Sequence, residues 1–556
     1  MTCLLLRSMK PVGFLPVLIM IFFWWSVGSL SHPTDGTGSD ETRDTKHGST
    51  FLVGVGKADI TGAVVQIPFA GYGKMNQTGT GLRQRTYARS FVFADPANIT
   101  NSFIYVVLDT QSGDTAVRYG ILQGLQTLGG KYGNFREHNV AVGGTHQHSG
   151  PGGWMNYLLP QIATLGFDKQ TYTAIVDGAL LSVQRAYDSL APSTISVGTI
   201  NIEDANINRS PYSYLANPAA ERAQYSSDTD TTMTLLTFDR LSDGKTTGVL
   251  SFFSVHGTSL YNNNTLVTGD NKGVAAYLFE RGATNDARFA DNFVAGFSQS
   301  SVGDMSPNVL GPFCEDTGLP CDFKTSTCNG RAEFCQARGP YFNEGDNGAK
   351  KEEYTVQRYE GASTLYGPNQ LAAYVNLSLA YLPYLGVPNA VAQLPKLPEG
   401  PRPPVTTNYS LAFVPGVAFD SPPFGHSFGD VLSSSTPYFY MVGDYVSATF
   451  VGANPRNDLR LEKTYAAVEM NIDGIWEVVR TDADWNLVFE WKQTNVLLGT
   501  SQVTLTWHIE DSYYLSGWGN ALQRGIYRLH YYGESKNAFG TISSFEGVGP
   551  EFSLQI

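Results

Sequence analysis

Two histidines that are two residues apart, His146 and His148, are the residues whose type and spacing most directly predict chemistry. An alternating apolar run beginning at Asn139 leads through Gly143 and Gly144 to this pair. On an extended backbone, positions i and i+2 project to the same side, so both imidazoles would face one point beyond the strand end. Two neutral imidazoles on one face suit a divalent transition metal, zinc above all. The alternative is a pair of structural histidines with ordinary hydrogen-bond partners.

A second apolar run has the same layout. Residues 249–255 predict a strand that leads directly into His256 and then Gly257. His256 could share one metal ion with His146 or His148. The alternative is a lone structural histidine.

Three further motifs hold polar groups that suit a reacting carbonyl. Ser306, in Gly-Asp-Met-Ser-Pro-Asn, is a candidate nucleophile or oxyanion donor if it lies beside a metal. Arg209, in Asn-Arg-Ser-Pro, suits a carboxylate or a developing oxyanion. Residues 352–359 are compatible with a helix that would present Tyr359 or Glu360 to a cleft. Each motif also has a purely structural interpretation. Ser306 could be a serine in a turn, Arg209 a surface arginine, and residues 352–359 the end of a surface helix.

The segments that must position these groups alternate between strands and helices up to about residue 385. Strands are predicted at 51–60, 90–94, 102–108, 194–202, 232–238 and 247–255, and helices within 109–128 and 172–190. This alternation predicts an α/β (α+β) catalytic domain with mixed sheets, spanning residues 50–394.

A proline-rich linker at 395–405 precedes a change of pattern. Helical periodicity is nearly absent from 406–556, where short strands are separated by turn signals. They are predicted at 438–441, 445–450, 466–472, 476–480, 486–492, 503–509, 525–532 and 552–556. This segment is predicted to be an all-β immunoglobulin-like sandwich.

The N-terminus and the charge narrow the class of protein. Arg7 and Lys10 precede an apolar run over residues 12–30, which predicts a secretory signal over residues 1–31, or a signal-anchor if it is not cleaved. A polar stretch, 32–49, reads as a flexible tether. The product would be secreted, lumenal or membrane-associated through the anchor. The net charge is -13 and no block of basic residues exists, so a nucleic-acid partner is excluded.

The cysteines fit an oxidising compartment. Cys314, Cys321, Cys328 and Cys335 recur every seven residues, which favours disulfides over a metal cluster and leaves three pairings open. Glycosylation sequons occur at Asn76, Asn98, Asn208, Asn263, Asn376 and Asn408, and the neighbouring Arg209 motif is expected to block the one at Asn208.

Taken in order, these motifs resemble the neutral (neutral/alkaline) ceramidase family from about residue 51 to the C-terminus. The residues that carry the resemblance are Gly-Thr-His-Gln-His-Ser-Gly-Pro-Gly-Gly, Asn-Arg-Ser-Pro, Val-His-Gly-Thr, Gly-Asp-Asn-Lys-Gly, Gly-Asp-Met-Ser-Pro-Asn and Tyr-Thr-Val-Gln-Arg-Tyr-Glu-Gly-Ala-Ser-Thr.

The resemblance implies a zinc amidase that hydrolyses the N-acyl bond of ceramide to sphingosine and a fatty acid, in sphingolipid catabolism. By position, His146 and His256 match zinc ligands, and His148, Arg209 and Tyr359 match residues that line the reacting amide. Ser306 matches the family serine, as nucleophile or supporting group, and the cysteines match an interlocked pair, Cys314–Cys328 and Cys321–Cys335. One Zn²⁺ per chain is expected, the family allows a structural Ca²⁺ or Mg²⁺, and a lipid substrate implies peripheral membrane contact.

The chain departs from the family pattern between Cys335 and Tyr359. A segment that carries a glutamate ligand is missing near residues 340–350, and Asn347 stands where a tyrosine ligand is expected. Glu344 or Asp346 could substitute. A lipid-binding relative with an incomplete zinc site and an amidase for another acyl amide are therefore the rival interpretations.

Overall fold

The computed structural model describes residues 50–339, 356–358, 380, 383, 412–435, 438–509 and 522–555. The predicted signal, the tether and the proline-rich linker lie outside these ranges. Within them, no helix combines the length and the apolar character needed to cross a bilayer.

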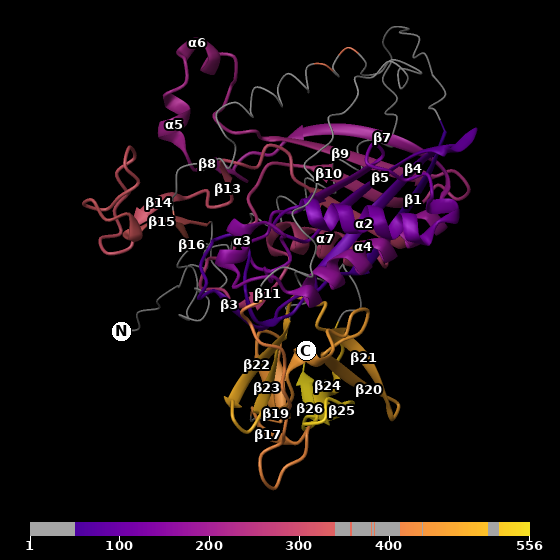
Figure 1. Cartoon of the computed structure of the whole chain (residues 1–556), viewed down its shortest axis with the longest axis vertical. Coiled ribbons are helices and arrows are strands. Elements are labelled where there is room, and N and C mark those ends of the chain that lie inside the picture. The colour runs from indigo at the N-terminus through magenta and orange to yellow at the C-terminus, as the bar shows by residue number, and fades with distance from the viewer. Residues whose placement is uncertain are drawn as a thin grey trace, which may run out of the picture. The chain divides into compact units, whose positions relative to one another are not determined.

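An eight-stranded mixed sheet forms the centre of the N-terminal part (Figure 1). Its order is β12-β10-β9-β7-β1-β4-β5-β6, antiparallel except for the parallel pairs β10–β12 and β5–β6 at its two edges. The strands are β1 (Phe51–Asp59), β4 (Tyr87–Asp95), β5 (Asn98–Leu108), β6 (Val140–Gly144), β7 (Ala191–Asn201), β9 (Thr232–Arg240), β10 (Thr246–Phe252) and β12 (Phe289–Ser298). This confirms the predicted mixed sheet.

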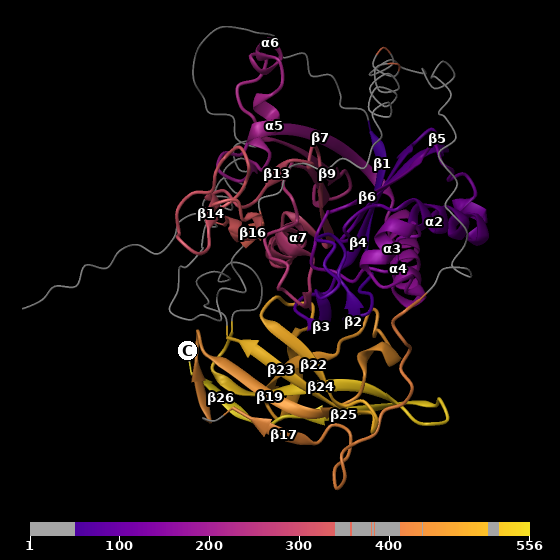
Figure 2. The same ribbon diagram turned by 60° about the vertical axis from the view of Figure 1, so that its left-hand side comes forward.

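Two amphipathic helices cover one face of this sheet, α2 (Thr115–Leu128) and α4 (Lys169–Asp188), and they lie against each other in both views (Figures 1 and 2). Asp114 caps α2 by accepting from the Ala116 N–H, and Asp168 caps α4 in the same way from Thr171. The apolar stripe of α2 is buried at Val117 and Ile121, as its helical spacing predicts.

The sheet is rolled, so that its two edges approach each other. Edge strand β12 also lies against β1, β4 and β5, and the Tyr105 hydroxyl on β5 is 2.7 Å from the Ser298 hydroxyl on β12. Apolar side chains fill the inside of the roll, among them Val55, Phe91 and Leu250. The chain segments that follow β6 and β10 can therefore meet, although these strands belong to opposite halves of the sheet.

The C-terminal part is an all-β sandwich, as predicted. One sheet holds β17 (Val431–Ser434), β19 (Tyr445–Gly452), β22 (Leu487–Asn495) and β23 (Thr500–His508). The other holds β18 (Phe439–Met441), β20 (Ala466–Ile472), β21 (Ile475–Thr481), β24 (Gly525–Lys536), β25 (Ile542–Val548) and β26 (Phe552–Gln555). Aromatic side chains such as Trp507, Tyr531 and Phe489 fill the space between the sheets. Strands β17 and β25 were not predicted.

The first sandwich sheet continues into the N-terminal part. Strand β3 (Thr78–Leu82) pairs with β22, with Leu82 opposite Phe489, and β2 (Val65–Pro68) and β11 (Leu266–Val267) extend the same sheet. A β-carbon at Gly81 would lie 2.0 Å from the Phe489 carbonyl oxygen, so this pairing requires glycine there.

The remaining α-helices and strands of the described chain are the 14-residue helix α7 and several short elements. They are α3 (Leu158–Ala163), β8 (Ile207–Asn208), α5 (Pro211–Leu215), α6 (Ala219–Arg222), α7 (Asp270–Ala283), β13 (Met305–Ser306), β14 (Gly311–Cys314), β15 (Cys335–Arg338) and β16 (Val356–Arg358).

The prediction of a helix over 352–359 was wrong where the structure describes it. Residues Val356–Arg358 form strand β16, which pairs antiparallel with β15. The backbone of this segment is satisfied by a neighbouring strand, so a long-range partner overrides the local helical pattern.

Candidate metal centre

His146 and His148 come together for a different reason from the one predicted. Strand β6 ends at Gly144, and His146 has a positive φ of 64°, so the backbone is not extended across the pair. The Thr145 and His146 N–H groups donate to the carbonyls of Leu108 and Thr110, which hold this turn at the strand end. The two rings nevertheless lie 5.0 Å apart between centroids.

The second histidine segment runs parallel to the first. The His148 N–H donates to the Gly257 carbonyl at 2.9 Å, and Gln147 forms a parallel bridge with Gly257. A β-carbon at Gly257 would lie 2.5 Å from the Gln147 α-carbon, so only glycine allows the contact. The glycine after His256 thus has a packing role that brings His256 to the other two histidines.

The three imidazoles form one group. Their closest ring nitrogens all lie within 4.8 Å of one another, and the Nε2 atoms of His146 and His256 are 2.9 Å apart. The His256 Nδ1 lies 2.9 Å from the Val302 carbonyl, which can only accept, so Nδ1 carries the proton and Nε2 keeps its lone pair. The rings of His148 and His256 are 5.2 Å apart.

The chemistry of this donor set fits a metal ion. His148 and His256 are 6% and 3% exposed, and neither ring nitrogen of His148 has a hydrogen-bond partner among the described residues. Two buried nitrogens without partners are costly unless something else binds them. A trio of convergent imidazoles is a known ligand set for catalytic zinc.

The electrostatics keep all three imidazoles neutral. Burial, assisted by the positive charge of Arg209, lowers the pKa of His146 to about 4. Burial also holds the pKa values of His148 and His256 well below their usual range, with added contributions from His146 and Arg209. Neutral imidazole is the form that binds metals.

Arg209 and Ser306 come from motifs that the structure joins. Strands β8 and β13 pair, with Ser306 opposite Ile207, and the Arg209 N–H donates to the Asp304 carbonyl. The Arg209 side chain donates to the Gly303 carbonyl at 2.9 Å. Ser306 is fully buried, its hydroxyl accepts from the Asn308 N–H, and the His256 N–H donates to the Met305 carbonyl.

Asn208 is buried at 5% exposure, and its side chain donates to the Asp228 carbonyl and the Asp304 carboxylate. This placement supports the prediction that its sequon is blocked.

Several predicted residues lie outside the described ranges. Tyr359, Glu344, Asp346 and Asn347 are among them. Among the described residues, groups of three or more potential metal-binding side chains are the histidine trio and Cys314, Cys321 and Cys328. Those sulfurs are in disulfides, so a structural Ca²⁺ or Mg²⁺ stays a prediction.

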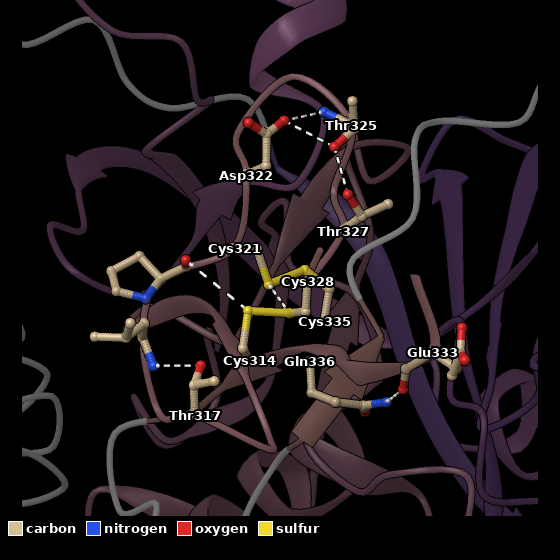
Figure 3. The surroundings of a disulfide bond; sticks show 12 residues. Cys314, Thr317, Cys321, Asp322, Thr325, Thr327, Cys328, Glu333, Cys335 and Gln336 are labelled. Carbon is tan, nitrogen blue, oxygen red and sulfur yellow. Dashed lines mark hydrogen bonds between the residues drawn. A yellow bond between two sulfur atoms is a disulfide. The ribbon is translucent and has the colours of Figure 1, made fainter. Parts of the chain in front are cut away.

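The disulfides pair as the family resemblance implies. Cys314 bonds to Cys328 and Cys321 to Cys335, each across 14 residues, and Figure 3 shows the two bonds side by side. Cys314 and Cys335 also face each other in the β14–β15 pair.

Sequence reasoning missed other residues around the trio. The Tyr72 ring meets His148 edge-on at 4.8 Å, and the Asn271 side chain donates to the His256 carbonyl at 2.7 Å. Asn271 lies in the Gly-Asp-Asn-Lys-Gly motif, which offered a signal. Tyr72 lies between Gly71 and Gly73, which both have positive φ, and this glycine pair was its only signal.

Comparisons with known proteins match nearly the whole described chain. Residues 51–351 match the family model described as neutral/alkaline non-lysosomal ceramidase, N-terminal, and residues 382–554 match the corresponding C-terminal one. Neutral ceramidase 2 of Arabidopsis thaliana is 28% identical, with 90% of this chain and 96% of that protein covered. Neutral ceramidase of Drosophila melanogaster is also 28% identical, with 91% and 97% covered. A crystal structure of neutral ceramidase from Pseudomonas aeruginosa is 25% identical, with a TM-score of 0.74 over 91% of this chain and 99% of that chain.

The matched region is shorter in this chain than in its relatives. The Arabidopsis alignment runs over 750 positions, whereas 90% of 556 residues is about 500, so about 250 aligned positions have no residue here. Because the alignment covers 96% of that relative, these positions lie inside the matched region. The shortfall agrees with the missing internal segment that the motif order predicts.

Proposed function

This chain belongs to the neutral/alkaline non-lysosomal ceramidase family, a family of hydrolases that act on amides, and from that premise we propose that it hydrolyses ceramide. The proposed reaction cleaves the N-acyl amide bond and releases sphingosine and a free fatty acid. The reaction would be a step of sphingolipid catabolism. It would take place in the secretory lumen or outside the cell.

One observation carries the proposal. Three neutral imidazoles from two distant segments, His146 half-buried and His148 and His256 buried, converge within 4.8 Å, and the charge of Arg209 acts on all of them. A purely structural His148 would be expected to have hydrogen-bond partners for its buried ring nitrogens, and it has none among the described residues.

Zinc is the metal we propose for the trio, with His146, His148 and His256 as its protein ligands. Three protein ligands and one open position are the usual arrangement of catalytic zinc. His148, which family position places beside the reacting amide, here takes the place of a ligand that this chain lacks. Zinc held there supplies Lewis-acid chemistry, which polarises a carbonyl and activates water near neutral pH.

In the proposed reaction, residues of the chain position the amide and stabilise the negative charge that develops on its carbonyl oxygen. The water oxygen adds to the amide carbon, the C–N bond breaks, and the amine of sphingosine leaves with a proton that the water supplied. The Arg209 guanidinium is placed to bind the negative charge that develops on the carbonyl oxygen. The Ser306 hydroxyl, on the strand that pairs with β8, serves as a supporting donor. Tyr359 keeps the role that its family position implies.

The test is metal analysis and ceramide turnover on one preparation of the full chain. We expect about one zinc per chain, sphingosine release from ceramide, loss of that release with a chelator, and its recovery when zinc is restored. Purified protein without zinc, and with no gain when zinc is added, would refute the proposal.

A second function, binding of ceramide without hydrolysis, is favoured by one observation. About 250 aligned positions are absent from the chain, and the family glutamate and tyrosine ligands are not found in its sequence. A chain that binds ceramide but releases no sphingosine would support this function. Sequencing of the transcript across codons 340–350 separates a true loss from an omitted segment.

An amidase for a different acyl amide shares all of the chemistry above. A panel of N-acyl substrates distinguishes it from a ceramidase, because only the acyl and amine groups differ. Preference for ceramide over simple N-acyl amines is the expected result.

A further inference from the structure

The side chain of Gln299 contacts both of the segments that carry the histidines. It directly follows β12, one edge of the rolled sheet, and it is half-buried. The residues it contacts, Thr145 and Val255, immediately precede His146 and His256. Gln299 therefore lies behind the candidate metal centre, and its hydrogen bonds go to the backbone of Thr145 and Val255 rather than to the imidazoles.

One amide group binds both segments at once. The Gln299 Nε2 donates to the Thr145 carbonyl at 2.7 Å and to the Val255 carbonyl at 2.5 Å. Its Oε1 accepts from the Val255 N–H at 3.2 Å. The orientation of the amide is dictated by its partners, because two carbonyls need donors and one N–H needs an acceptor.

The chemistry of these contacts is specific to glutamine. Glutamate has the same length but no donor for two carbonyls, and methionine has the same length but neither donor nor acceptor. Asparagine keeps the amide on a side chain shorter by one methylene group. Each substitution removes a different property of the contact.

Other side chains hold the His256 segment without reaching the His146 segment, and the backbone bridge between the two segments, from the His148 N–H to the Gly257 carbonyl, follows the histidines rather than preceding them. The Lys272 Nζ donates to the carbonyls of Phe253 and Ser298, and the His256 Nδ1 pairs with the Val302 carbonyl. Among the described residues, Gln299 is the side chain whose hydrogen bonds reach the backbone on both sides, one residue before each histidine.

We propose that Gln299 is a positioning residue that fixes the separation of His146 and His256 by clamping the backbones of Thr145 and Val255 to each other. The proposal rests on the proposed function, because it treats the imidazoles as metal ligands. Its consequence is that zinc affinity depends on an amide that touches neither the metal nor the substrate. Outer partners that orient metal ligands are typically worth 10- to 100-fold in affinity.

The test compares zinc affinity, the visible spectrum of the cobalt-substituted protein and thermal stability in Gln299→Met and Gln170→Met. Gln170 is the matched control, because it is also half-buried and its side chain donates to a distant carbonyl, that of Arg456, at 2.8 Å. We expect Gln299→Met to lose about 10- to 100-fold in zinc affinity with an altered cobalt spectrum, and Gln170→Met to lose only stability. In turnover, Gln299→Met should lower kcat more than it raises KM.

Gln299→Asn provides a second variant in case Gln299→Met does not fold, since it keeps the amide and changes only its reach. A weakened zinc site in Gln299→Asn supports the clamp. Wild-type affinity and spectrum in the folded variants, or an equal loss of affinity in Gln170→Met, overturn the clamp alone. A wild-type chain that binds no zinc overturns the clamp and the proposed function together.

Discussion

The three imidazoles of the candidate metal centre are held by the protein to different degrees. The Val302 carbonyl accepts from His256, and the side-chain nitrogen of Gln111 lies 3.5 Å from the Nδ1 of His146. Neither nitrogen of His148 has a partner among the described residues, although it packs edge-on against Tyr72. His148 is therefore the ring whose position depends most on a bound ion.

Replacement of His148 by alanine tests whether it is a ligand or a proton carrier. As a third ligand, its loss should weaken zinc binding by more than the 10- to 100-fold that an outer partner is worth. As a proton carrier alone, its loss should leave zinc affinity unchanged and lower kcat by about 10²- to 10⁴-fold. Competition with a chelator and steady-state kinetics on the same protein distinguish the two. His426→Ala, at an exposed histidine paired with Asp430, is the control that should change neither.

For single residues, the sequence predicted that the three histidines lie together, but it did not predict the backbone conformation that brings them together. The types and order of His146, His148 and His256 were sufficient signals because imidazole pairs at strand ends are uncommon. The predicted extended backbone was wrong, since the left-handed turn at His146 depends on hydrogen bonds to Leu108 and Thr110. Gln299 carried no signal, because its partners are backbone atoms of segments 154 and 44 residues away.

Among the elements, helix α7 has an unusual connection to the sheet. Lys272 in its first turn is 4% exposed and donates to the last carbonyl of β12, Ser298, and to Phe253 just beyond β10. Burial lowers the pKa of Lys272 to about 7. A neutral amine keeps two N–H groups, so both hydrogen bonds persist after the proton leaves.

Lys272 therefore predicts a specific pH dependence of stability. Between about pH 7 and the model-peptide pKa of about 10.4, the unfolded chain holds a proton that the folded chain has released, so unfolding takes up a proton. The free energy of unfolding contributed by this group rises with pH over that range, by at most about 1.4 kcal/mol per pH unit. Urea unfolding at pH 7 and pH 9 measures the free energy of unfolding of wild type and of Lys272→Met. From pH 7 to pH 9, the wild type should gain stability relative to Lys272→Met. If the difference in unfolding free energy between the two proteins were the same at both pH values, Lys272 would not be a neutral amine in the folded chain.

The elements themselves were predictable where their pattern is periodic. Helices α2 and α4 and strands β1, β4 and β5 follow from apolar spacing. The strand at residues 356–358 could not be predicted from spacing, because its pairing with β15 is a long-range contact that competes with local helical preference. Strands β17 and β25 were missed because their exposed residues give no alternating pattern.

For the whole molecule, the sequence predicted two domains joined by a linker, and the structure adds contacts that join them directly. Arg85 pairs with Asp59 in the N-terminal part and with Asp482 in the sandwich, and all three side chains are at most 3% exposed. Strand β3 adds backbone pairing to β22. Such contacts cannot be read from sequence, because Arg85 and Asp482 are 397 residues apart.

Removal of one member of this buried pair should destabilise the folded chain strongly. Asp482→Ala leaves the Arg85 guanidinium buried with Asp59 as its remaining carboxylate, and loss of one partner of a buried pair typically costs about 3–5 kcal/mol. Asp286→Ala is the control, because it breaks a surface pair with the exposed Arg288, and surface pairs contribute about 1 kcal/mol or less. Urea unfolding followed by tryptophan fluorescence measures both.

The double variant Arg85→Met/Asp482→Leu tests the cause. If the cost arises from an uncompensated buried charge, apolar side chains of similar volume should recover much of it, since such replacements are often neutral. If the pair also joins the two parts into one folding unit, wild type should unfold in one transition and Asp482→Ala in two. Two transitions already in wild type would show that the sandwich folds independently of the N-terminal part. Equal losses in Asp482→Ala and Asp286→Ala would contradict a strong contribution from the buried pair.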